Sequence, residues 1–486
     1  MSVHTPGLRD RIRSGRWAIA IVLDRVGRMD DVRRLLEQTA SIAADYVESL
    51  GERRVFPEVT VDELRATLGG PLPEHPIDAE QVVTELAAGA EPGVVAMGSG
   101  RYFGFVIGGA LPAALAADWL ATTWDQNAGL YVAGPSASVV EEVAREWIVE
   151  LLGLPQDASL GFVTGTQMAH VTGLAAARFH VLDAVGWDVG RDGLQGAPRI
   201  RVLVGAKRHV TVDRALRLLG LGCPTVVEAD EQGRMRAAAL ADALSAGEGP
   251  TIVCAQAGEV NSGAFDPLAE IADACEATSA WLHVDGAFGI WAAVSPELRH
   301  LVAGLERADS WTTDAHKWLN VPYDSGIVLC AHPESHRRAM AVHAEYLIHD
   351  EAVRDQMDWV PEFSRRARGF AVYAALRSLG RSGVVELVER ACAQARRVAD
   401  GISELPGAQV LNEVVLNQVL FRFADDGQTD AALAAVQASG EVWLSGTTWN
   451  GEKAIRVSVS NWRTDDAETD LLVEAFRRAA DVRVAG

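Results

Sequence analysis

Short runs of β-branched and apolar residues recur through the middle of this sequence, and stretches with helical periodicity separate them. The runs are Arg201-Val202-Leu203-Val204, Thr225-Val226-Val227, Thr251-Ile252-Val253-Cys254, Trp281-Leu282-His283-Val284 and Gly326-Ile327-Val328-Leu329. Strands of this kind are buried on both faces, and strands that alternate with helices pair in parallel. The sequence therefore predicts an α/β domain with a mostly parallel sheet over residues 90–345.

A smaller α+β domain is expected over residues 381–486, after a loop and a connecting helix over residues 346–380. The periodicity predicts the following elements in this part of the chain: a helical passage over 365–405, strands over 419–423 and 454–459, and a helix over 466–480. The second domain is thus expected to pack a short sheet against helices.

Residues 1–89 are expected to form an N-terminal arm and a helical segment. A helix is predicted over residues 30–50. Pro71, Pro73 and Pro76 then indicate an irregular crossing. The apolar run at 17–23 resembles the start of a secretory signal, but Asp24 and Arg25 end it and no cleavage pattern follows. We expect residues 1–28 to be a loosely attached arm, with Met29 as an alternative start.

The charge balance argues against two classes of partner. The chain has 44 basic and 66 acidic residues, and the net charge of −22 would repel nucleic acids and anionic membranes. Five cysteines without a C-x-x-C spacing predict neither a disulfide framework nor a structural zinc site. No apolar run approaches the roughly 18 residues of a membrane-spanning helix. We expect a cytoplasmic protein without a metal site.

Polar residues at the carboxyl ends of the predicted strands are the first candidates for a ligand site. Thr166 begins a helix after a strand over 161–164, and amides at a helix start can bind a phosphate. Taken alone, Thr166 could equally be a cap without a ligand, and His209 could be a solvated histidine. Asp285 ends a buried strand, where a carboxylate needs a cationic partner and a salt bridge to an arginine would suffice.

Lys317 changes the interpretation of these candidates. It follows an apolar strand and precedes Trp318 and Leu319, surroundings that can lower a lysine's pKa and favour imine formation. A lysine amine that holds an aldehyde and a carboxylate that holds a ring cation are what pyridoxal phosphate requires from a protein. Lys317 and Asp285 together therefore predict a pyridoxal phosphate site.

Two motifs then carry a specific family resemblance. His283-Val284-Asp285-Gly286-Ala287-Phe288-Gly289 and Asp314-Ala315-His316-Lys317-Trp318-Leu319 stand at the spacing of the group II pyridoxal phosphate-dependent amino acid decarboxylases, which include aromatic amino acid and glutamate decarboxylases. The chain resembles this family from about residue 30 to residue 480. Supporting matches lie at 263–267 and 456–463. The resemblance implies an aspartate aminotransferase-like fold of type I and a homodimer with shared active sites.

The resemblance also implies residue roles. Lys317 would form the Schiff base, Asp285 would hold the pyridine nitrogen, and His209 would stack on the ring. Further cofactor contacts are expected from Thr166, Gln167, Gln256, Ala287 and His316, and from Ser364 toward a neighbouring subunit. The substrate-pocket candidates are Tyr102, Phe103, Phe105 and Gln356.

The sequence departs from the family pattern at two places. Residues 350–359 contain no tyrosine where relatives carry one near the reprotonated carbon; our alignment puts Gln356 there, and Tyr346 lies a little upstream. Members without that tyrosine can divert the intermediate toward oxygen and form an aldehyde. At Asp314 many relatives have asparagine near the phosphate. Because a carboxylate repels a phosphate, we expect the Asp314 side chain to turn away.

The leading interpretation is decarboxylation of an L-amino acid through a Schiff base at Lys317 and a quinonoid intermediate. The alternatives are decarboxylation-coupled oxidative deamination, another Cα or Cβ lyase reaction on the same scaffold, and a non-catalytic binding protein with this fold. A metal hydrolase is disfavoured because His283, Asp285 and His316 lack a clear further ligand and no H-E-x-x-H occurs. The identity of the amino acid stays open.

Overall fold

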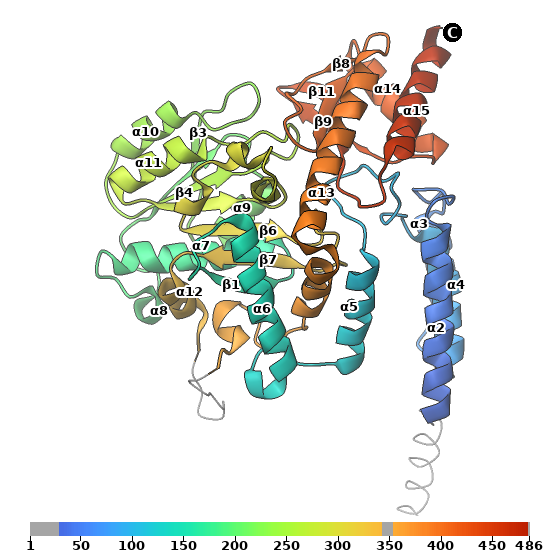
Figure 1. Ribbon diagram of the computed structural model, residues 1–486, viewed down its shortest axis with the longest axis horizontal. Helices are drawn as coiled ribbons and strands as arrows, with labels where there is room; N and C mark the ends of the chain where they lie inside the picture. The colour runs from blue at the N-terminus through green and yellow to red at the C-terminus, as the bar shows by residue number, and fades with distance from the viewer. Residues whose placement is uncertain (1–28, 343–352, 485–486) are drawn as a thin grey trace, which may run out of the picture. The chain divides into compact units, whose positions relative to one another are not determined.

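The computed structural model describes residues 29–342 and 353–484, and the chain divides into two compact units, Met1–Ala96 and Met97–Gly486 (Figure 1). The expected arm over residues 1–28 lies outside the described residues. The helices of the first unit are α2 (Met29–Ser49), α3 (Val61–Leu68) and α4 (Ala79–Ala90), followed by the short 3₁₀ helix η1 (Glu91–Gly93). The helix predicted over 30–50 is confirmed.

Capping residues fix where two of these helices begin. Thr60 and Glu63 form a capping box at the start of α3, and the Asp78 side chain accepts amides of the first turn of α4. α3 buries none of its residues and α4 buries only Gly89. The apolar side chains of these two helices are therefore not covered within the single chain.

A seven-stranded sheet forms the centre of the second unit. Its strands are β1 (Ser159–Val163), β2 (Arg201–Gly205), β3 (Thr225–Val227), β4 (Thr251–Gln256), β5 (Trp281–Asp285), β6 (Ser310–Asp314) and β7 (Gly326–Cys330). Their order is β1-β7-β6-β5-β4-β2-β3, and only the pairs of β7 with β1 and β6 are antiparallel. Every residue of β1, β4, β5, β6 and β7 is buried. The predicted mostly parallel, doubly covered sheet is confirmed.

Helices cover both faces of this sheet. They are α5 (Pro112–Trp124), α6 (Pro135–Leu152), α7 (Thr166–Asp183), α8 (Val189–Asp192), α9 (Val210–Leu218), α10 (Ala237–Ser245), α11 (Leu268–Thr278) and α12 (Pro333–Met340), with 3₁₀ helices η2 (Tyr131–Ala133), η3 (Gly289–Val294), η4 (Arg299–Val302) and η5 (Leu305–Arg307). Alternate strand residues point to opposite faces. Val202 and Ile252 therefore pack with α7 and α9, whereas Leu203 and Val253 pack with α10 and α11.

The C-terminal part begins with the 3₁₀ helix η6 (Gln356–Trp359) and the long helix α13 (Gly369–Ser403), which Gly380 interrupts. An antiparallel sheet in the order β10-β11-β9-β8 follows. Its strands and helices are β8 (Gln409–Val410), β9 (Gln418–Arg422), α14 (Asp426–Ser439), β10 (Ser445–Trp449), β11 (Glu452–Ser458) and α15 (Asp466–Val484). The predicted strands β9 and β11 and the helices α13 and α15 are confirmed; β8, β10 and α14 were not predicted.

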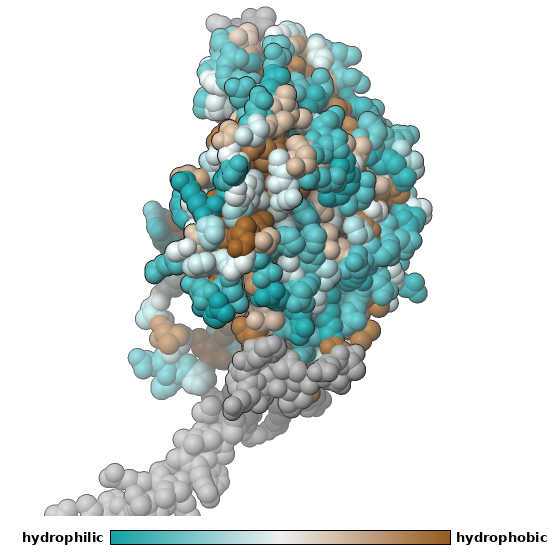
Figure 2. All heavy atoms as spheres, turned by 90° about the vertical axis from the view of Figure 1, so that its left-hand side faces the viewer, coloured by the Kyte–Doolittle hydropathy of each residue, from teal (hydrophilic) through white to brown (hydrophobic). Residues whose placement is uncertain are grey.

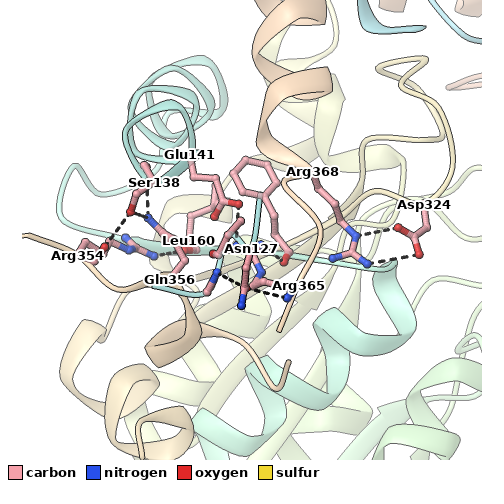
Figure 3. Close-up of polar contacts among 12 residues, drawn as sticks. Asn127, Ser138, Glu141, Leu160, Asp324, Arg354, Gln356, Arg365 and Arg368 are labelled. Atoms are coloured by element: carbon pink, nitrogen blue, oxygen red, sulfur yellow. Dashed lines mark hydrogen bonds and ion pairs between the residues drawn. The ribbon is translucent and has the colours of Figure 1, made fainter. Parts of the chain in front are cut away.

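A buried polar cluster fastens the segment after residue 353 to the large sheet (Figure 3). We call it the arginine cluster, and its members are Ser138, Glu141, Arg354, Gln356 and Arg365. Arg365 Nη1 lies 2.7 Å from Glu141 Oε1, and Arg365 Nη2 donates to the carbonyl of Phe162 in β1 at 2.7 Å. Both charged side chains are almost fully buried. Removing either one would leave an unpaired buried charge, at a cost of about 3 to 5 kcal/mol.

The surface around α10 and α11 is mostly hydrophilic, with small, separate apolar patches (Figure 2). Within the described ranges, 29–342 and 353–484, no helix combines the length and apolar character needed to span a membrane. The same residues contain no group of three or more histidine, cysteine, aspartate or glutamate side chains placed to hold a metal ion.

Candidate active site

The strand ends bring several predicted site residues to one edge of the large sheet. The last residue of β1, Val163, and the last residue of β6, Asp314, both pair with Gly326. β5 ends beside β6 at Asp285, and β4 ends beside β5 at Gln256. The amides of the first turn of α7, which follow β1, therefore face the same edge as these carboxyl ends.

Lys317 lies three residues beyond the end of β6. Its Nζ is 3.1 Å from Asp314 Oδ2 and 6.0 Å from the centre of the Phe288 ring, and the side chain is 22% exposed. A Cβ placed on Gly108 would lie 2.0 Å from the Lys317 carbonyl oxygen, so only glycine allows this close approach. The lysine amine is thus held on a rigid turn, open to a small molecule on one side.

Asp314 corrects one expectation, because its side chain does not turn away from the helix start. Its Oδ1 accepts the Thr166 amide at 2.6 Å and lies 3.5 Å from His316 Nε2. Burial alone would raise the pKa of this carboxyl, but Lys317, His316 and the Thr166 amide outweigh burial and hold the pKa low. The expectation considered only repulsion by a phosphate; attraction by Lys317 and by the start of α7 orients the side chain.

Asp285 is an ionised carboxylate at the end of β5, only 5% exposed. Its Oδ1 accepts the amide of Ala287 at 3.1 Å, and its Oδ2 lies 3.4 Å from Nε2 of His170. Burial acts to raise the pKa of Asp285, but His170, His209 and Lys317 together bring it well below the usual range. The site thus contains a carboxylate of lowered pKa within electrostatic reach of the Lys317 amine.

Unpaired polar atoms surround these charges. Within the described ranges, Thr166 Oγ1, Gln167 Oε1, Gln256 Nε2 and Ser325 Oγ are buried and have no hydrogen-bond partner. Ser325 directly precedes the residue that pairs with Val163 and Asp314, so its hydroxyl belongs to the same edge. Buried polar groups of this kind are costly unless a ligand satisfies them. The Gln167 oxygen can only accept, whereas the Thr166 and Ser325 hydroxyls and the Gln256 amide can donate to an anion such as a phosphate.

His209 adds an imidazole ring to the site, and Arg456 adds a guanidinium cation. His209 caps α9, and its Nδ1 is 2.8 Å from Thr211 Oγ1. Loss of hydration lowers the pKa of His209; Asp285 opposes this, while Lys317 and Arg456 add to it, so all three charges act on the imidazole. Arg456 lies on β11, is 9% exposed, and its buried Nε is without a partner among the described residues.

The three aromatic pocket candidates occupy different environments. Tyr102 stacks on Trp443 with ring centres 5.1 Å apart, and burial raises the pKa of Tyr102 to about 12. Phe105 also contacts Trp443, at 5.6 Å, and is exposed. Phe103 is fully buried in the hydrophobic core. Phe103 is therefore a core residue, and Tyr102 and Phe105 are left as candidates for contact with a substrate.

Gln356 does not lie where the alignment put it. Its Nε2 is 3.3 Å from both the carbonyl and the hydroxyl oxygen of Ser138, inside the arginine cluster (Figure 3). Among the described residues it makes no contact with Lys317 or Asp285. Tyr346, the upstream tyrosine, lies outside the described residues.

The remaining candidates have the following positions. Ala287 accepts the amide of Asp314 at 2.9 Å, Gln167 donates to the Thr211 carbonyl at 3.3 Å, and His316 stacks on Tyr323 with ring centres 4.2 Å apart. Ser364 is exposed on the single chain, as a contact with a neighbouring subunit would require, and its role stays a prediction.

Sequence reasoning missed His170 and Arg456, and also Ser325, whose place in the site follows from the pairing of Gly326 with β1 and β6. His170 stands one helical turn after Thr166, so the 3.6-residue period of α7 would have placed it on the same face. Arg456 lies in the motif noted at 456–463, but nothing in the sequence indicated that β11 brings it to the edge of another sheet. His170 was detectable from the sequence; Arg456 needed the tertiary structure.

Known proteins share both the sequence pattern and the fold. Residues 62–424 match the pyridoxal-dependent decarboxylase conserved domain. An aromatic-L-amino-acid decarboxylase of Bacillus atrophaeus is 28% identical over 90% of this chain and 93% of its own length, and a phenylacetaldehyde synthase of Arabidopsis thaliana is 25% identical over 87% and 90%. A crystal structure of Oryza sativa TDC with PLP and tryptamine is 24% identical, covers 94% of this chain and 99% of its own, and has a TM-score of 0.88. This likeness confirms the predicted type I fold.

Proposed function

Because this chain belongs to the pyridoxal-dependent decarboxylase family, we propose that it removes carbon dioxide from an L-amino acid with pyridoxal phosphate held by Lys317 and Asp285. The observation that carries the proposal is the arrangement of a lysine amine, an ionised buried carboxylate and unpaired buried donors at one sheet edge. The protein is a pyridoxal phosphate-dependent carboxy-lyase; the assignment of the reaction to these residues is the proposal.

The residues of the site suit this cofactor. The hydroxyls of Thr166 and Ser325 would hold the phosphate beside the start of α7, where the Thr166 amide already binds Asp314, and Asp285 would hold a protonated ring nitrogen. Gln256 would offer its unpaired amide nitrogen to the ring substituents, and Ala287 would pack on one face of the ring. When bound to a lysine through its aldehyde, pyridoxal phosphate withdraws electrons from the Cα of an attached amino acid.

The charged side chains then have defined tasks. Asp314 Oδ2, 3.1 Å from Lys317 Nζ, can take the proton that Nζ must lose before the amine acts as a nucleophile. The same Nζ can return a proton near Cα after carbon dioxide leaves. His209, close to Asp285 and Lys317, would cover the ring on the substrate side.

Arg456 is the best candidate for holding the α-carboxylate of the amino acid. It is the buried guanidinium whose charge acts on His209, and its unpaired Nε offers a donor. Tyr102 and Phe105 both contact Trp443, which lies two residues before Ser445, the strand partner of Arg456, and these rings would give an aromatic wall. We therefore expect aromatic L-amino acids to be better substrates than acidic ones, in agreement with the names of the relatives.

Two outcomes compete after carbon dioxide leaves, an amine or an aldehyde. The aldehyde alternative rested on Gln356 in place of a tyrosine, and it is kept open by the similarity to a phenylacetaldehyde synthase. Because Gln356 packs on Ser138, its identity carries no information about the reacting carbon. Tyr346 then becomes the tyrosine to consider, and we favour the amine.

Carbon dioxide release and oxygen uptake, measured together on the same sample, distinguish these outcomes. We expect carbon dioxide without oxygen uptake in the wild-type protein, and measurable oxygen uptake with peroxide in Tyr346→Phe. Tyr373→Phe is the matched control, since Tyr373 stacks on Trp147 in the helical layer. Oxygen uptake equal to carbon dioxide release in the wild-type protein would contradict the amine.

We also propose that the protein is a homodimer. Large apolar side chains are exposed along α5, at Trp119, Leu120 and Trp124, and along the helices of the first unit, at Leu36 and Leu86. Exposed apolar patches of this kind mark surfaces that another chain covers. A dimer would also allow Ser364 to reach a second active site.

Light scattering tests the assembly. We expect twice the 52.0 kDa of one chain for the wild-type protein and a shift toward 52.0 kDa for Trp119→Asp. Val185→Asp is the control, because Val185 is similarly exposed in the turn after α7. A wild-type mass of one chain, or equal shifts in both variants, would refute the α5 interface.

A further inference from the structure

Behind Asp285, a line of buried polar side chains runs from one strand of the large sheet into α7. His170 Nε2 lies 3.4 Å from Asp285 Oδ2, and His170 Nδ1 lies 2.9 Å from His283 Nε2. His283 Nδ1 lies 2.8 Å from Ser310 Oγ, which also accepts Trp281 Nε1–H at 2.9 Å. Of the residues in this line, only Asp285 is among the binding residues assigned above.

The close packing of α7 on β5 makes the line possible. A Cβ on Gly173 would lie 3.0 Å from His283 Cε1, so a larger residue there would push the helix away from the strand. His170 and His283 are both fully buried, and their rings meet edge to face with centres 5.2 Å apart. Three of the four ring nitrogens are hydrogen-bonded within the line, and the fourth, His170 Nε2, faces Asp285.

The proton positions follow by elimination. Asp285 is a carboxylate that only accepts, and His170 Nε2 faces it at 3.4 Å with no hydrogen-bond partner among the described residues, so this nitrogen carries its hydrogen toward the carboxylate across a long contact. Burial lowers the pKa of His283 to about 3, so His283 is neutral and has a single N–H. When His170 is neutral, its Nδ1 is an acceptor, His283 Nε2 donates to it, and the Ser310 hydroxyl donates to His283 Nδ1. The Trp281 indole can only donate, so it fixes the direction of the hydrogen bonds at the Ser310 end of the line.

We propose that His170 is a positioning residue for the cofactor, whose Nε2–H holds the Asp285 carboxylate ionised and oriented toward the ring nitrogen, with its tautomer set by His283, Ser310 and Trp281. The inference rests on the proposed function at Lys317 and Asp285. It adds the residue that keeps the ring nitrogen of the cofactor protonated. Without the His170 donor the carboxylate becomes more basic and draws that proton toward itself. The ring then withdraws fewer electrons from Cα.

Two substitutions separate this role from simple packing. His170→Leu fills the space but removes the donor. His170→Gln restores it, because a glutamine amide nitrogen reaches about as far as histidine Nε2. His336→Leu is the matched control, since His336 is also a fully buried histidine, and its ring nitrogens face Ser159 and the Trp359 carbonyl rather than any residue of this line.

The first readout is the protonation of the ring nitrogen, measured by nitrogen NMR of bound, ring-labelled pyridoxal phosphate. We expect His170→Leu to shift the signal toward neutral pyridine and to lower kcat about tenfold to a hundredfold with little change in KM, the range for residues that orient a reactive group from behind. His170→Gln and His336→Leu should keep the wild-type signal. An unshifted signal in His170→Leu, or equal shifts in His170→Leu and His170→Gln, would overturn the proposal.

The second readout needs no cofactor. In the cofactor-free protein, the loss of thermal stability caused by His170→Leu should be much smaller when Asp285→Asn is also present, because the charge that His170 stabilises is then gone. Additive effects would overturn the proposal even if the chain binds the cofactor. Absence of the cofactor from Lys317 in the wild-type protein would instead refute the proposed function, and the stability cycle would still decide whether His170 holds Asp285.

Discussion

Replacing Lys317 with alanine is expected to lower kcat for decarboxylation by at least about a thousandfold, because the nucleophile that attaches the cofactor is then missing. No other amine can take its place. The sequence contains only two more lysines, Lys207 and Lys453. Lys207 Nζ is bound to Asn450 at 2.9 Å and lies over the Trp449 ring, and Lys453 is exposed on β11. The measurement is the rate of carbon dioxide release with the best amino acid.

Lys453→Ala is the matched control for this experiment. It removes an exposed lysine of the same chain and should leave kcat and KM unchanged. A Lys317→Ala protein that keeps more than about a tenth of the wild-type rate with added cofactor would show that Lys317 is not the attachment point.

The second large effect is expected for Asp285→Asn, which keeps the size of the side chain and removes its charge. A ring nitrogen facing a neutral amide is not kept protonated, so we expect kcat to fall about a hundredfold to a thousandfold. Cofactor should still attach to Lys317, because the phosphate donors and the amine are untouched. The expected signature is thus a loaded but slow enzyme, measured by absorption and by carbon dioxide release on the same sample.

Asp309→Asn controls for the loss of a partly buried carboxylate in the same sheet. Asp309 lies just before β6, at the opposite end of that strand from Asp314, and accepts the Leu282 amide at 2.6 Å. The Asp309→Asn substitution should lower thermal stability with little change in kcat. Equal losses of kcat in both variants would mean that Asp285 acts through stability alone.

The strand ends of the site were predictable because buried strands leave a strong signal in the sequence. β4 is a buried run of mostly apolar residues and β5 is apolar except for His283 and its terminal Asp285, so the pattern places Asp285 at the end of a parallel strand. By contrast, β10, with the sequence Ser-Gly-Thr-Thr-Trp, has no apolar run, and its burial alternates. β10 forms because β11 pairs with it. A local sequence pattern contains no information about such a pairing.

Side-chain orientation was less predictable. Asp314 was expected to avoid the start of α7, yet the attraction of Lys317 and of the Thr166 amide orients it there. Gln356 was assigned by loop alignment, and the buried partners that hold it lie more than 200 residues earlier in the chain. Contacts between distant segments decided both cases, and sequence spacing contains no information about them.

The most direct test of the assignment of pyridoxal phosphate to Lys317 is borohydride reduction of the protein with its cofactor, followed by mass spectrometry of the peptides. Three lysines make the result unambiguous. We expect the pyridoxyl mass on the peptide that contains Lys317 and on neither of the other two lysine peptides. Label on Lys207 or Lys453 instead, or no label after incubation with excess cofactor, would contradict this assignment.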